Sequence, residues 1–326
     1  MRALRFSAPG NPLDALALEA LSLPDPGPGE VRLRMRLCPI NPSDLLQVQG
    51  VYGRMPGLPA TAGLEGLGVV EALGEGVTGW ALGDRAVPLG AQGTWAEALV
   101  TPSENLVRVP DGLADDQAAQ VIVNPLTAWI MAHQLGLGRG QTLLQSAAGS
   151  IVGRALIQLG KVMGFRTVNL VRRPEQVMEL LSLGADAVVC TEDPEWLRQM
   201  ARFLPQGADA AVDAVGGALG GEMVKLLAPG GTMLVYGALS MEPLQLPGGQ
   251  LIFRTATVRG FWLTDWKRRT PKAERDAICQ ALLACMAEGK VVCPVAGIHP
   301  LEGWRNAVRQ ALTPGRGGKV LLSMQG

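Results

Sequence analysis

Residues 142–173 read TLLQSAAGSIVGRALIQLGKVMGFRTVNLVRR, and this stretch decides the fold. An apolar run, 142–146, is followed by the small residues 147–150. Apolar side chains then recur at helical spacing from Ile151 to Met163, and a second apolar run follows at 167–171. This order predicts a strand, a tight turn, a helix and a second strand, which together form one βαβ unit of a parallel sheet.

The turn of this unit is typical of a dinucleotide site, because small residues let backbone N–H groups and the positive end of a helix approach a pyrophosphate. The G-x-G-x-x-G frame falls on 148–153 and keeps only Gly153 in register. After the second strand comes Arg172-Arg173, where an NAD site would place an acidic residue. Guanidinium groups attract a 2′-phosphate, so the pattern favours NADPH. The alternative is a strand-to-helix turn with solvated arginines.

The rest of the chain predicts two domains. Strand and helix patterns alternate after Gly140, which implies a doubly wound parallel sheet. The first 120 residues are rich in glycine and proline with short apolar runs, which indicates an irregular β-rich domain. A terminal strand, Lys319–Ser323, returns to this domain. We expect a dinucleotide-binding domain at 121–267 and a second domain formed by 1–120 with 268–326.

Composition narrows the functional classes. The chain has 326 residues, of which 48% are hydrophobic, with 29 Lys+Arg and 29 Asp+Glu. Because neither sign of charge dominates, neither a nucleic acid nor a membrane surface is expected as a partner. The five cysteines form no C-x-x-C pair, which favours a reducing compartment. The start MRALRFSAPG resembles neither a signal peptide nor a transit segment, so we expect a cytoplasmic protein.

Several motifs resemble the medium-chain dehydrogenase/reductase superfamily along the whole chain. They are Gly83-Asp84-Arg85-Ala86-Val87, Leu183-Gly184-Ala185-Asp186, Val212-Asp213-Ala214-Val215-Gly216-Gly217 and Leu227-Ala228-Pro229-Gly230-Gly231-Thr232. Others are similar to the 2-enoyl thioester reductases, namely Asn41-Pro42-Ser43-Asp44, Gln49-Gly50-Val51-Tyr52-Gly53, Asn124-Pro125-Leu126-Thr127-Ala128 and the segment 260–267. The resemblance implies a Rossmann domain with a GroES-like domain.

The zinc ligands of the alcohol dehydrogenases in this superfamily are missing. Asn41 and Leu64 stand where those enzymes have a cysteine and a histidine. The two histidines, His133 and His299, have no partner at ligand spacing. The resemblance therefore implies a zinc-independent enzyme, and we expect no metal.

Without a metal, the plausible chemistry is hydride transfer to an activated acceptor such as an enoyl thioester. Hydride would reach the β-carbon and a proton the α-carbon. Tyr52 is the candidate proton donor, because it is one of two tyrosines, lies in a glycine-flanked loop, and an ordinary phenol titrates near pH ~10. Trp262 resembles the residue that lines the acyl and nicotinamide pocket. The alternatives are a tyrosine that only packs and a core aromatic residue.

The resemblance also implies the residues that meet the cofactor. Asn124 resembles the polar residue beside the nicotinamide, although an ordinary helix N-cap is the alternative. The further candidates are Gly149, Ser150, Ile151, Val152, Arg172, Arg173, Tyr236, Gly237, Ala238, Leu239, Phe261, Trp262, Leu263, Thr264 and Lys319. The basic cluster 267–269 with Lys272 could bind phosphates of coenzyme A or an acyl carrier protein, but a solvated turn is favoured.

The sequence thus predicts an NADPH-dependent reductase of trans-2-enoyl thioesters carried by coenzyme A or an acyl carrier protein. One alternative is an NADPH:quinone oxidoreductase, which needs no dedicated proton donor. The other is an NADPH-binding protein without catalysis. Relatives in the superfamily often dimerise through edge strands, so we expect a homodimer that uses residues 256–261.

Overall fold

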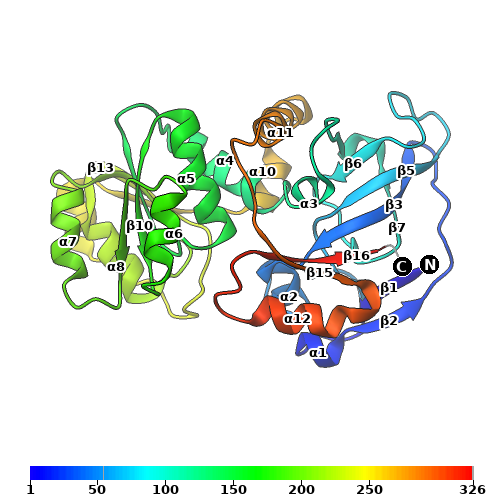
Figure 1. Ribbon diagram of the computed structural model, residues 1–326, viewed down its shortest axis with the longest axis horizontal. Helices are drawn as coiled ribbons and strands as arrows, with labels where there is room; N and C mark the ends of the chain where they lie inside the picture. Colours follow the sequence, from blue (N-terminus) through cyan, green and yellow to red (C-terminus); the bar gives the residue numbers. More distant parts are fainter. Residues whose placement is uncertain (54, 325–326) are drawn as a thin grey trace. The chain divides into compact units, whose positions relative to one another are not determined.

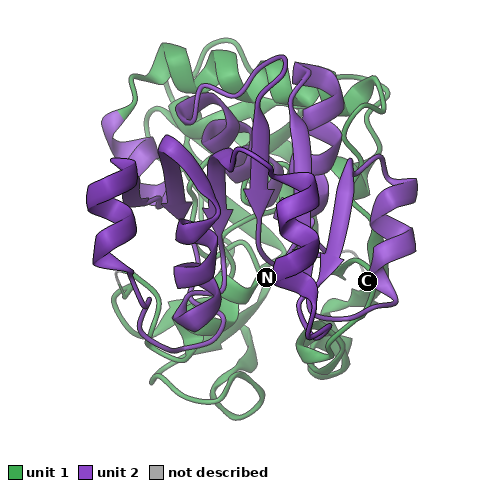
Figure 2. Cartoon of the chain, turned by 90° about the vertical axis from the view of Figure 1, so that its left-hand side faces the viewer, with its two compact units in different colours: residues 1–123, 270–326 green, residues 124–269 purple. Residues whose placement is uncertain are grey.

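The computed structural model describes residues 1–53 and 55–324 and divides into two compact units. Unit 1 consists of Met1–Val123 and Thr270–Gly326, and unit 2 of Asn124–Arg269 (Figure 2). Residues 325–326, which end the segment predicted for the β-rich domain, lie outside the described residues. Each unit has its own sheets and core.

Unit 2 is built on a six-stranded parallel sheet with the strand order β11-β10-β9-β12-β13-β14 (Figure 1). The order reverses between β9 and β12, so the predicted doubly wound sheet is confirmed. The strands are β9 (Thr142–Gln145), β10 (Arg166–Val171), β11 (Ala187–Cys190), β12 (Ala208–Asp213), β13 (Leu227–Val235) and β14 (Thr257–Gly260).

Helices of unit 2 connect these strands, and one further helix lies before the first strand and one after the last. They are α4 (Asn124–Gln134), α5 (Ile151–Met163), α6 (Gln176–Ser182), α7 (Trp196–Phe203), α8 (Gly217–Lys225), α9 (Gly248–Arg254) and α10 (Leu263–Arg269). Right-handed crossovers place α5 and α6 on one face of the sheet and α7 and α8 on the other. Leu144, Val168, Ala211 and Met233 are buried in the core beside the sheet.

Helix α5 spans the residues predicted for it, and its ends explain its length. Ser150 caps the start, where its side chain accepts a hydrogen bond from the Gly153 N–H. Gly164 ends the helix in the left-handed conformation with φ 86°, which a residue without a Cβ adopts at no steric cost. Because α5 begins at Ile151, its first turn follows closely after the carboxyl end of β9.

Unit 1 contains two sheets. One has the order β2-β1-β4, and the other has seven strands in the order β15-β16-β3-β5-β6-β8 with β7 also paired to β3. The strands are β1 (Arg2–Phe6), β2 (Ala17–Ala20), β3 (Glu30–Pro39), β4 (Ala60–Thr61), β5 (Leu67–Leu73), β6 (Arg85–Pro88), β7 (Ala98–Pro102), β8 (Leu106–Arg108), β15 (Val295–Pro300) and β16 (Lys319–Ser323).

Five α-helices and two 3-10 turns accompany these sheets in the described part of unit 1. They are α1 (Pro12–Ala15), α2 (Pro42–Val48), α3 (Asp115–Ala118), α11 (Lys272–Ala287) and α12 (Trp304–Leu312), with 3-10 turns η1 (Ser103–Asn105) and η2 (Leu301–Gly303). Within 1–53 and 55–324, no helix combines the length and the apolar character that crossing a bilayer would require.

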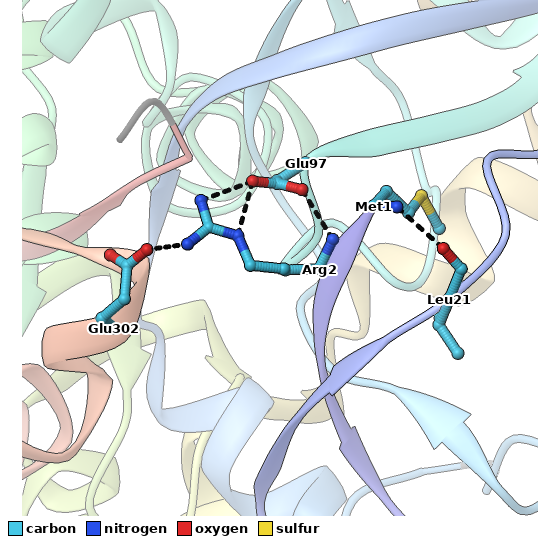
Figure 3. A network of polar contacts seen from close by, with 5 residues as sticks. All are labelled: Met1, Arg2, Leu21, Glu97 and Glu302. Atoms are coloured by element: carbon cyan, nitrogen blue, oxygen red, sulfur yellow. Dashed lines mark hydrogen bonds and ion pairs between the residues drawn. The ribbon is translucent and has the colours of Figure 1, made fainter.

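The two chain segments of unit 1 are joined by both sheet pairing and polar contacts. Strand β16 pairs antiparallel with β3, so the C-terminal segment completes the larger sheet, as predicted. Arg2 binds Glu97 through its Nη2 at 2.6 Å and also pairs with Glu302 of the C-terminal segment (Figure 3). Trp95 and Trp304, one from each segment, are buried in the same core.

Candidate active site

Most of the predicted cofactor residues follow the carboxyl ends of parallel strands in unit 2. Residues 149–152 follow β9, Arg172 and Arg173 follow β10, 236–239 follow β13, and 261–264 follow β14. Since parallel strands end at one edge of the sheet, the structure brings these four groups to that edge. The ends of β13 and β14 are joined there by a 2.8 Å hydrogen bond from the Phe261 N–H to the Val235 carbonyl.

Strands β9 and β12 are tied together where the strand order reverses. The Ser146 hydroxyl donates to Asp213 Oδ1 at 2.6 Å and accepts from the Ala214 N–H at 2.9 Å. Asp213 also accepts from the N–H groups of Val215 and Gly216 at 2.9 and 3.0 Å. These bonds fix the crevice at which ligands of doubly wound sheets bind.

The turn after β9 is tightly packed. A Cβ at Gly153 would lie 2.4 Å from the Ala148 carbonyl oxygen, so only glycine fits where the helix passes the turn. The Ile151 side chain is buried, and the backbone of Ile151 and Val152 forms the first turn of α5. Burial raises the pKa of the Tyr236 hydroxyl, and neighbouring Ser150 partly opposes that shift. The helix start and the end of β13 therefore meet.

The two arginines after β10 form a positively charged site. The Arg172 side chain is exposed and Arg173 is half-buried, and no carboxylate among the described residues forms an ion pair with either. The Cys190 thiol at the end of neighbouring β11 donates to the Arg172 carbonyl at 3.2 Å. Unpaired guanidinium groups at this strand end suit a phosphate ligand.

Two other predicted residues of unit 2 lie at helix starts. Asn124 is the first residue of α4, and Trp262, which is 40% exposed, directly precedes α10. The expectation of a solvated turn for 267–269 is wrong, because these residues lie in α10. Asp265 forms ion pairs with Arg268 at 2.5 Å and Arg269 at 2.7 Å, and these pairs support the helix.

Tyr52 lies in unit 1, in the loop that follows α2. It is half-buried and lies between Gly50 (φ 79°) and Gly53 (φ 53°), whose left-handed backbone favours glycine. The Val51 N–H donates to the Leu46 carbonyl at 3.0 Å, which ties the loop back to the helix. The glycine pair thus gives the loop its shape, as the sequence indicated.

Four polar side chains form a buried network in the same unit, which we call the Lys319 network: Asn41, Asp44, Glu65 and Lys319. Lys319 Nζ donates to Asn41 Oδ1 at 2.6 Å, and Asn41 Nδ2 donates to Glu65 Oε2 at 3.0 Å. Glu65 Oε1 accepts from the Val123 N–H at 2.7 Å, and Asp44 Oδ2 accepts from the Asn41 N–H at 2.6 Å. None of the four side chains is more than 2% exposed.

Burial dominates the acid–base properties of the Lys319 network. It raises the pKa of Asp44 and of Glu65 to about 7 in each case, against hydrogen bonds that favour the carboxylates. Burial also lowers the pKa of Lys319 to about 8, although Glu65 and Asp44 favour its charged form. Burial therefore shifts all three groups toward their uncharged forms.

Comparisons with known proteins place the chain in a family. Residues 27–111 match the family model described as alcohol dehydrogenase GroES-like domain, and 152–279 match the one described as zinc-binding dehydrogenase. A mitochondrial enoyl-[acyl-carrier-protein] reductase of Xenopus tropicalis is 37% identical over 335 residues, covering 99% of this chain and 95% of that protein. The chain belongs to the medium-chain dehydrogenase/reductase superfamily. The predicted GroES-like and Rossmann domains and an oxidoreductase that depends on a nicotinamide cofactor are thereby confirmed.

Further members of the superfamily show the same relationship. The human mitochondrial enoyl-[acyl-carrier-protein] reductase is 34% identical and covers 99% of this chain and 89% of its own length. A Bacillus thuringiensis structure assigned as an NADPH:quinone reductase has a TM-score of 0.93 at 32% identity, covering 99% of this chain and 98% of that one. A complex of Etr1p with NADP and crotonyl-CoA has a TM-score of 0.89 at 27% identity, and 99% of each chain is covered.

The residues present do not fit the zinc ion that the family description names. The Asn41 carboxamide accepts from Lys319 and donates to Glu65, and a carboxamide is not among the Cys, His and Asp/Glu side chains that bind zinc in proteins. Leu64 has no ligand atom. Among the described residues, no group of three or more His, Cys, Asp or Glu side chains could hold a metal ion. A buried ammonium group in the network would also repel a cation.

Sequence reasoning missed the other members of the Lys319 network. Lys319 was predicted as a cofactor residue, and its role there stays a prediction; in the structure its ammonium group donates to Asn41. Asp44 and Glu65 were not singled out as site residues. A signal was present, since Asp44 belongs to the Asn-Pro-Ser-Asp motif and Glu65 follows Leu64, which the resemblance aligns with a histidine of the zinc-dependent enzymes.

Proposed function

We propose that this protein reduces trans-2-enoyl thioesters of coenzyme A or an acyl carrier protein with NADPH. The observation that carries the proposal is the match over 99% of the chain to reductases named for enoyl-acyl-carrier-protein substrates. The unpaired arginines after β10 support NADPH over NADH, because a 2′-phosphate gains two charge-assisted partners there.

The cofactor would be held along the carboxyl edge of the unit 2 sheet. The N–H groups of the first turn of α5, at Ile151 and Val152, would receive the pyrophosphate with the positive end of the helix behind them. Arg172 and Arg173 would bind the 2′-phosphate. The remaining predicted contacts are Asn124, Gly149, Ser150, Tyr236, Gly237, Ala238, Leu239, Phe261, Trp262, Leu263, Thr264 and Lys319.

The reaction needs a hydride at the β-carbon and a proton at the α-carbon, and the bound nicotinamide supplies the hydride. Tyr52 would deliver the proton, either directly or through a water that its hydroxyl holds. Its half-buried place in a glycine-bounded loop supports this role, because such a loop lets a phenol face a ligand while its ring stays packed. Trp262 would line the acyl site.

The test is the rate of NADPH oxidation with crotonyl-CoA and with enoyl-CoA substrates of increasing length. We expect turnover with at least part of this series and a clear preference for NADPH over NADH. Absence of turnover at every chain length, with cofactor binding intact, would contradict the proposed reaction. The same substrates attached to an acyl carrier protein then identify the preferred carrier.

The quinone reductase alternative is favoured by one observation, the TM-score of 0.93 to the Bacillus thuringiensis protein assigned to that activity. A quinone acceptor added to the same assay separates the two reactions. If quinones alone oxidise NADPH, the alternative holds. If NADPH binds and no acceptor oxidises it, the protein is a cofactor-binding protein without catalysis.

We also propose that the protein forms a homodimer through the open edge of the unit 2 sheet. Among the described residues, strand β14 pairs with β13 alone, and helix α9 just before it exposes Phe253 and Ile252 at 86% and 69%. Exposed apolar side chains beside an open strand favour pairing with a second copy. Light scattering should give a dimer mass for the native chain and a monomer mass for Phe253→Asp.

The cytoplasm is the proposed location. All five cysteines lie in the described part of the chain and are free thiols, which suits a reducing compartment. The relatives named above from Xenopus tropicalis and human are mitochondrial proteins. Fractionation of cells that express the tagged full chain decides between the two compartments.

A further inference from the structure

The turn after β9 contains a residue in a conformation that its side chain disfavours. Ala147 has φ 48°, in the left-handed region where a Cβ crowds the backbone. The turn is held by two backbone bonds, from the Ser150 N–H to the Ala147 carbonyl at 2.9 Å and from the Ala148 N–H to the Leu170 carbonyl at 3.1 Å. A strained residue persists only where its surroundings fix it.

A buried arginine supplies a further restraint on this turn. Arg154 of α5 is 7% exposed, and its Nε donates to the Gly149 carbonyl at 3.1 Å. Gly149 precedes the N-cap Ser150, so its carbonyl accepts no hydrogen bond within the helix, and the Gly153 N–H of the first turn donates to the Ser150 hydroxyl at 3.1 Å. Arg154 therefore binds the Gly149 carbonyl, an acceptor that helix α5 does not use.

The other end of the guanidinium is fixed by a neighbouring helix. Arg154 Nη2 lies 2.6 Å from Glu179 Oε1 of α6. The Gln176 side chain of the same helix lies over the turn, since a Cβ at Gly149 would come within 2.0 Å of its Nε2. The turn is thus enclosed between side chains of α5 and α6.

We propose that Arg154 is a positioning residue that holds the turn 147–149 in the shape that receives the cofactor pyrophosphate. This inference rests on the proposed function, because it needs the cofactor to bind at this turn. Arg154 itself need not touch the cofactor. It orients the Gly149 carbonyl away from the phosphates, so that the N–H groups at the start of α5 face them.

The first test is the Kd for NADPH, measured by fluorescence titration of the full-length protein. Arg154→Ala removes a charge-assisted hydrogen bond, so we expect the Kd to rise roughly tenfold. Arg154→Lys should lose most of the affinity as well, because one ammonium group cannot reach both Gly149 and Glu179 with the same geometry. The KM for NADPH should rise likewise, while kcat at saturating NADPH stays within about twofold, because the reacting groups are untouched.

The matched control is Arg198→Ala. This variant also removes an arginine–glutamate pair, formed with Glu195 at 3.2 Å on the exposed surface of α7. We expect it to leave the Kd unchanged. Glu179→Ala provides a second route to the same question if Arg154→Ala does not fold, because Glu179 is partly exposed and its loss frees one end of the guanidinium. It should raise the Kd about threefold, in line with the loss of one exposed ion pair.

A rescue experiment separates positioning from general loss of structure. Glycine adopts the left-handed conformation without cost, so Ala147→Gly in the Arg154→Ala background should restore most of the NADPH affinity. A Kd that stays elevated in the double variant would contradict a role through the turn. If Arg154→Ala and Glu179→Ala both bind NADPH with native affinity, the positioning role of Arg154 is wrong and the proposed function stands. If the native chain does not bind NADPH, the proposed function itself is wrong.

Discussion

Lys319 Nζ donates a 2.6 Å hydrogen bond to Asn41 Oδ1, and both side chains are buried in unit 1. The amide of Asn41 joins this cation to Glu65, because its Nδ2 donates to the carboxyl at 3.0 Å. A neutral side chain thus connects two ionisable groups that each lose hydration by burial. The resemblance to zinc-dependent members of the superfamily aligns Asn41 with one of their ligands, and in this chain Asn41 belongs to a hydrogen-bonded network.

Removing the central amide should destabilise unit 1 strongly. Asn41→Ala leaves the ammonium group of Lys319 and one oxygen of Glu65 without this partner in a buried site. We expect the free energy of unfolding to fall by about 3 kcal/mol, the cost of leaving buried charged groups unsatisfied. Urea denaturation at pH 7.5 measures this free energy of unfolding. Asn306→Ala, on the exposed face of α12, is the control and should change stability by less than about 0.5 kcal/mol.

The Lys319 network should also make stability depend on pH. Burial raises the pKa of Glu65 to about 7, whereas an unfolded glutamate titrates near ~4.3. Between these values the folded chain binds more protons than the unfolded one, so the free energy of unfolding decreases as pH rises through this window. Glu65→Gln should remove this contribution and flatten the pH profile by at most about 4 kcal/mol.

Other groups contribute to the same profile. Asp44, whose pKa is also raised to about 7, should leave a residual slope of the same sign in Glu65→Gln. Lys319 acts in the opposite direction at higher pH, because its pKa is lowered to about 8 and the unfolded chain binds more protons between that value and ~10.4. Glu274→Gln on the exposed side of α11 is the control. A profile for Glu65→Gln identical to that of the native chain would contradict the assignment.

Local patterns predicted much of the fold. The helix Ile151–Met163 and the strands Thr257–Gly260 and Lys319–Ser323 have the bounds that their apolar runs and glycine boundaries indicate. The basic residues 267–269 were expected in a solvated turn, but they form the last turn of helix α10. Asp265 stabilises this helix through ion pairs with Arg268 and Arg269, at i+3 and i+4 spacing. A pattern of hydrophobic residues does not predict such ion pairs.

The candidate site was predictable only in part, because some of its contacts join residues that are far apart in the sequence. The cofactor edge follows from one βαβ unit, since parallel strands bring their carboxyl ends together whatever the detailed packing. The contact between Asn41 and Lys319 joins residues 278 positions apart, and no local pattern encodes it. Burial of Glu65 and of Arg154 depends likewise on neighbours from other elements, so their roles emerge only with tertiary structure.

The arginines after β10 should discriminate between the two nicotinamide cofactors. Replacing Arg172 and Arg173 with alanine removes two charge-assisted partners of a 2′-phosphate, each worth roughly 1.5–3 kcal/mol. We expect kcat/KM for NADPH to fall at least about 100-fold while the value for NADH changes less than about threefold. Arg202→Ala, on the exposed surface of α7, is the matched control for loss of positive charge in unit 2. Equal losses with both cofactors would rule out recognition of the 2′-phosphate.

Tyr52 provides the sharpest test of the proposed chemistry, because it separates reduction of an enoyl thioester from reduction of a quinone. Tyr52→Phe keeps the ring that packs in the loop and removes the hydroxyl, so it should lower kcat for enoyl-CoA at least about 100-fold, the usual contribution of a positioned proton donor. NADPH affinity and any quinone turnover should be unchanged. Val51→Ala alters the neighbouring side chain, which is 62% exposed, and should retain nearly full activity. If Tyr52→Phe turns over crotonyl-CoA at the native rate, the proton comes from another group, and the glycine-bounded loop serves packing alone.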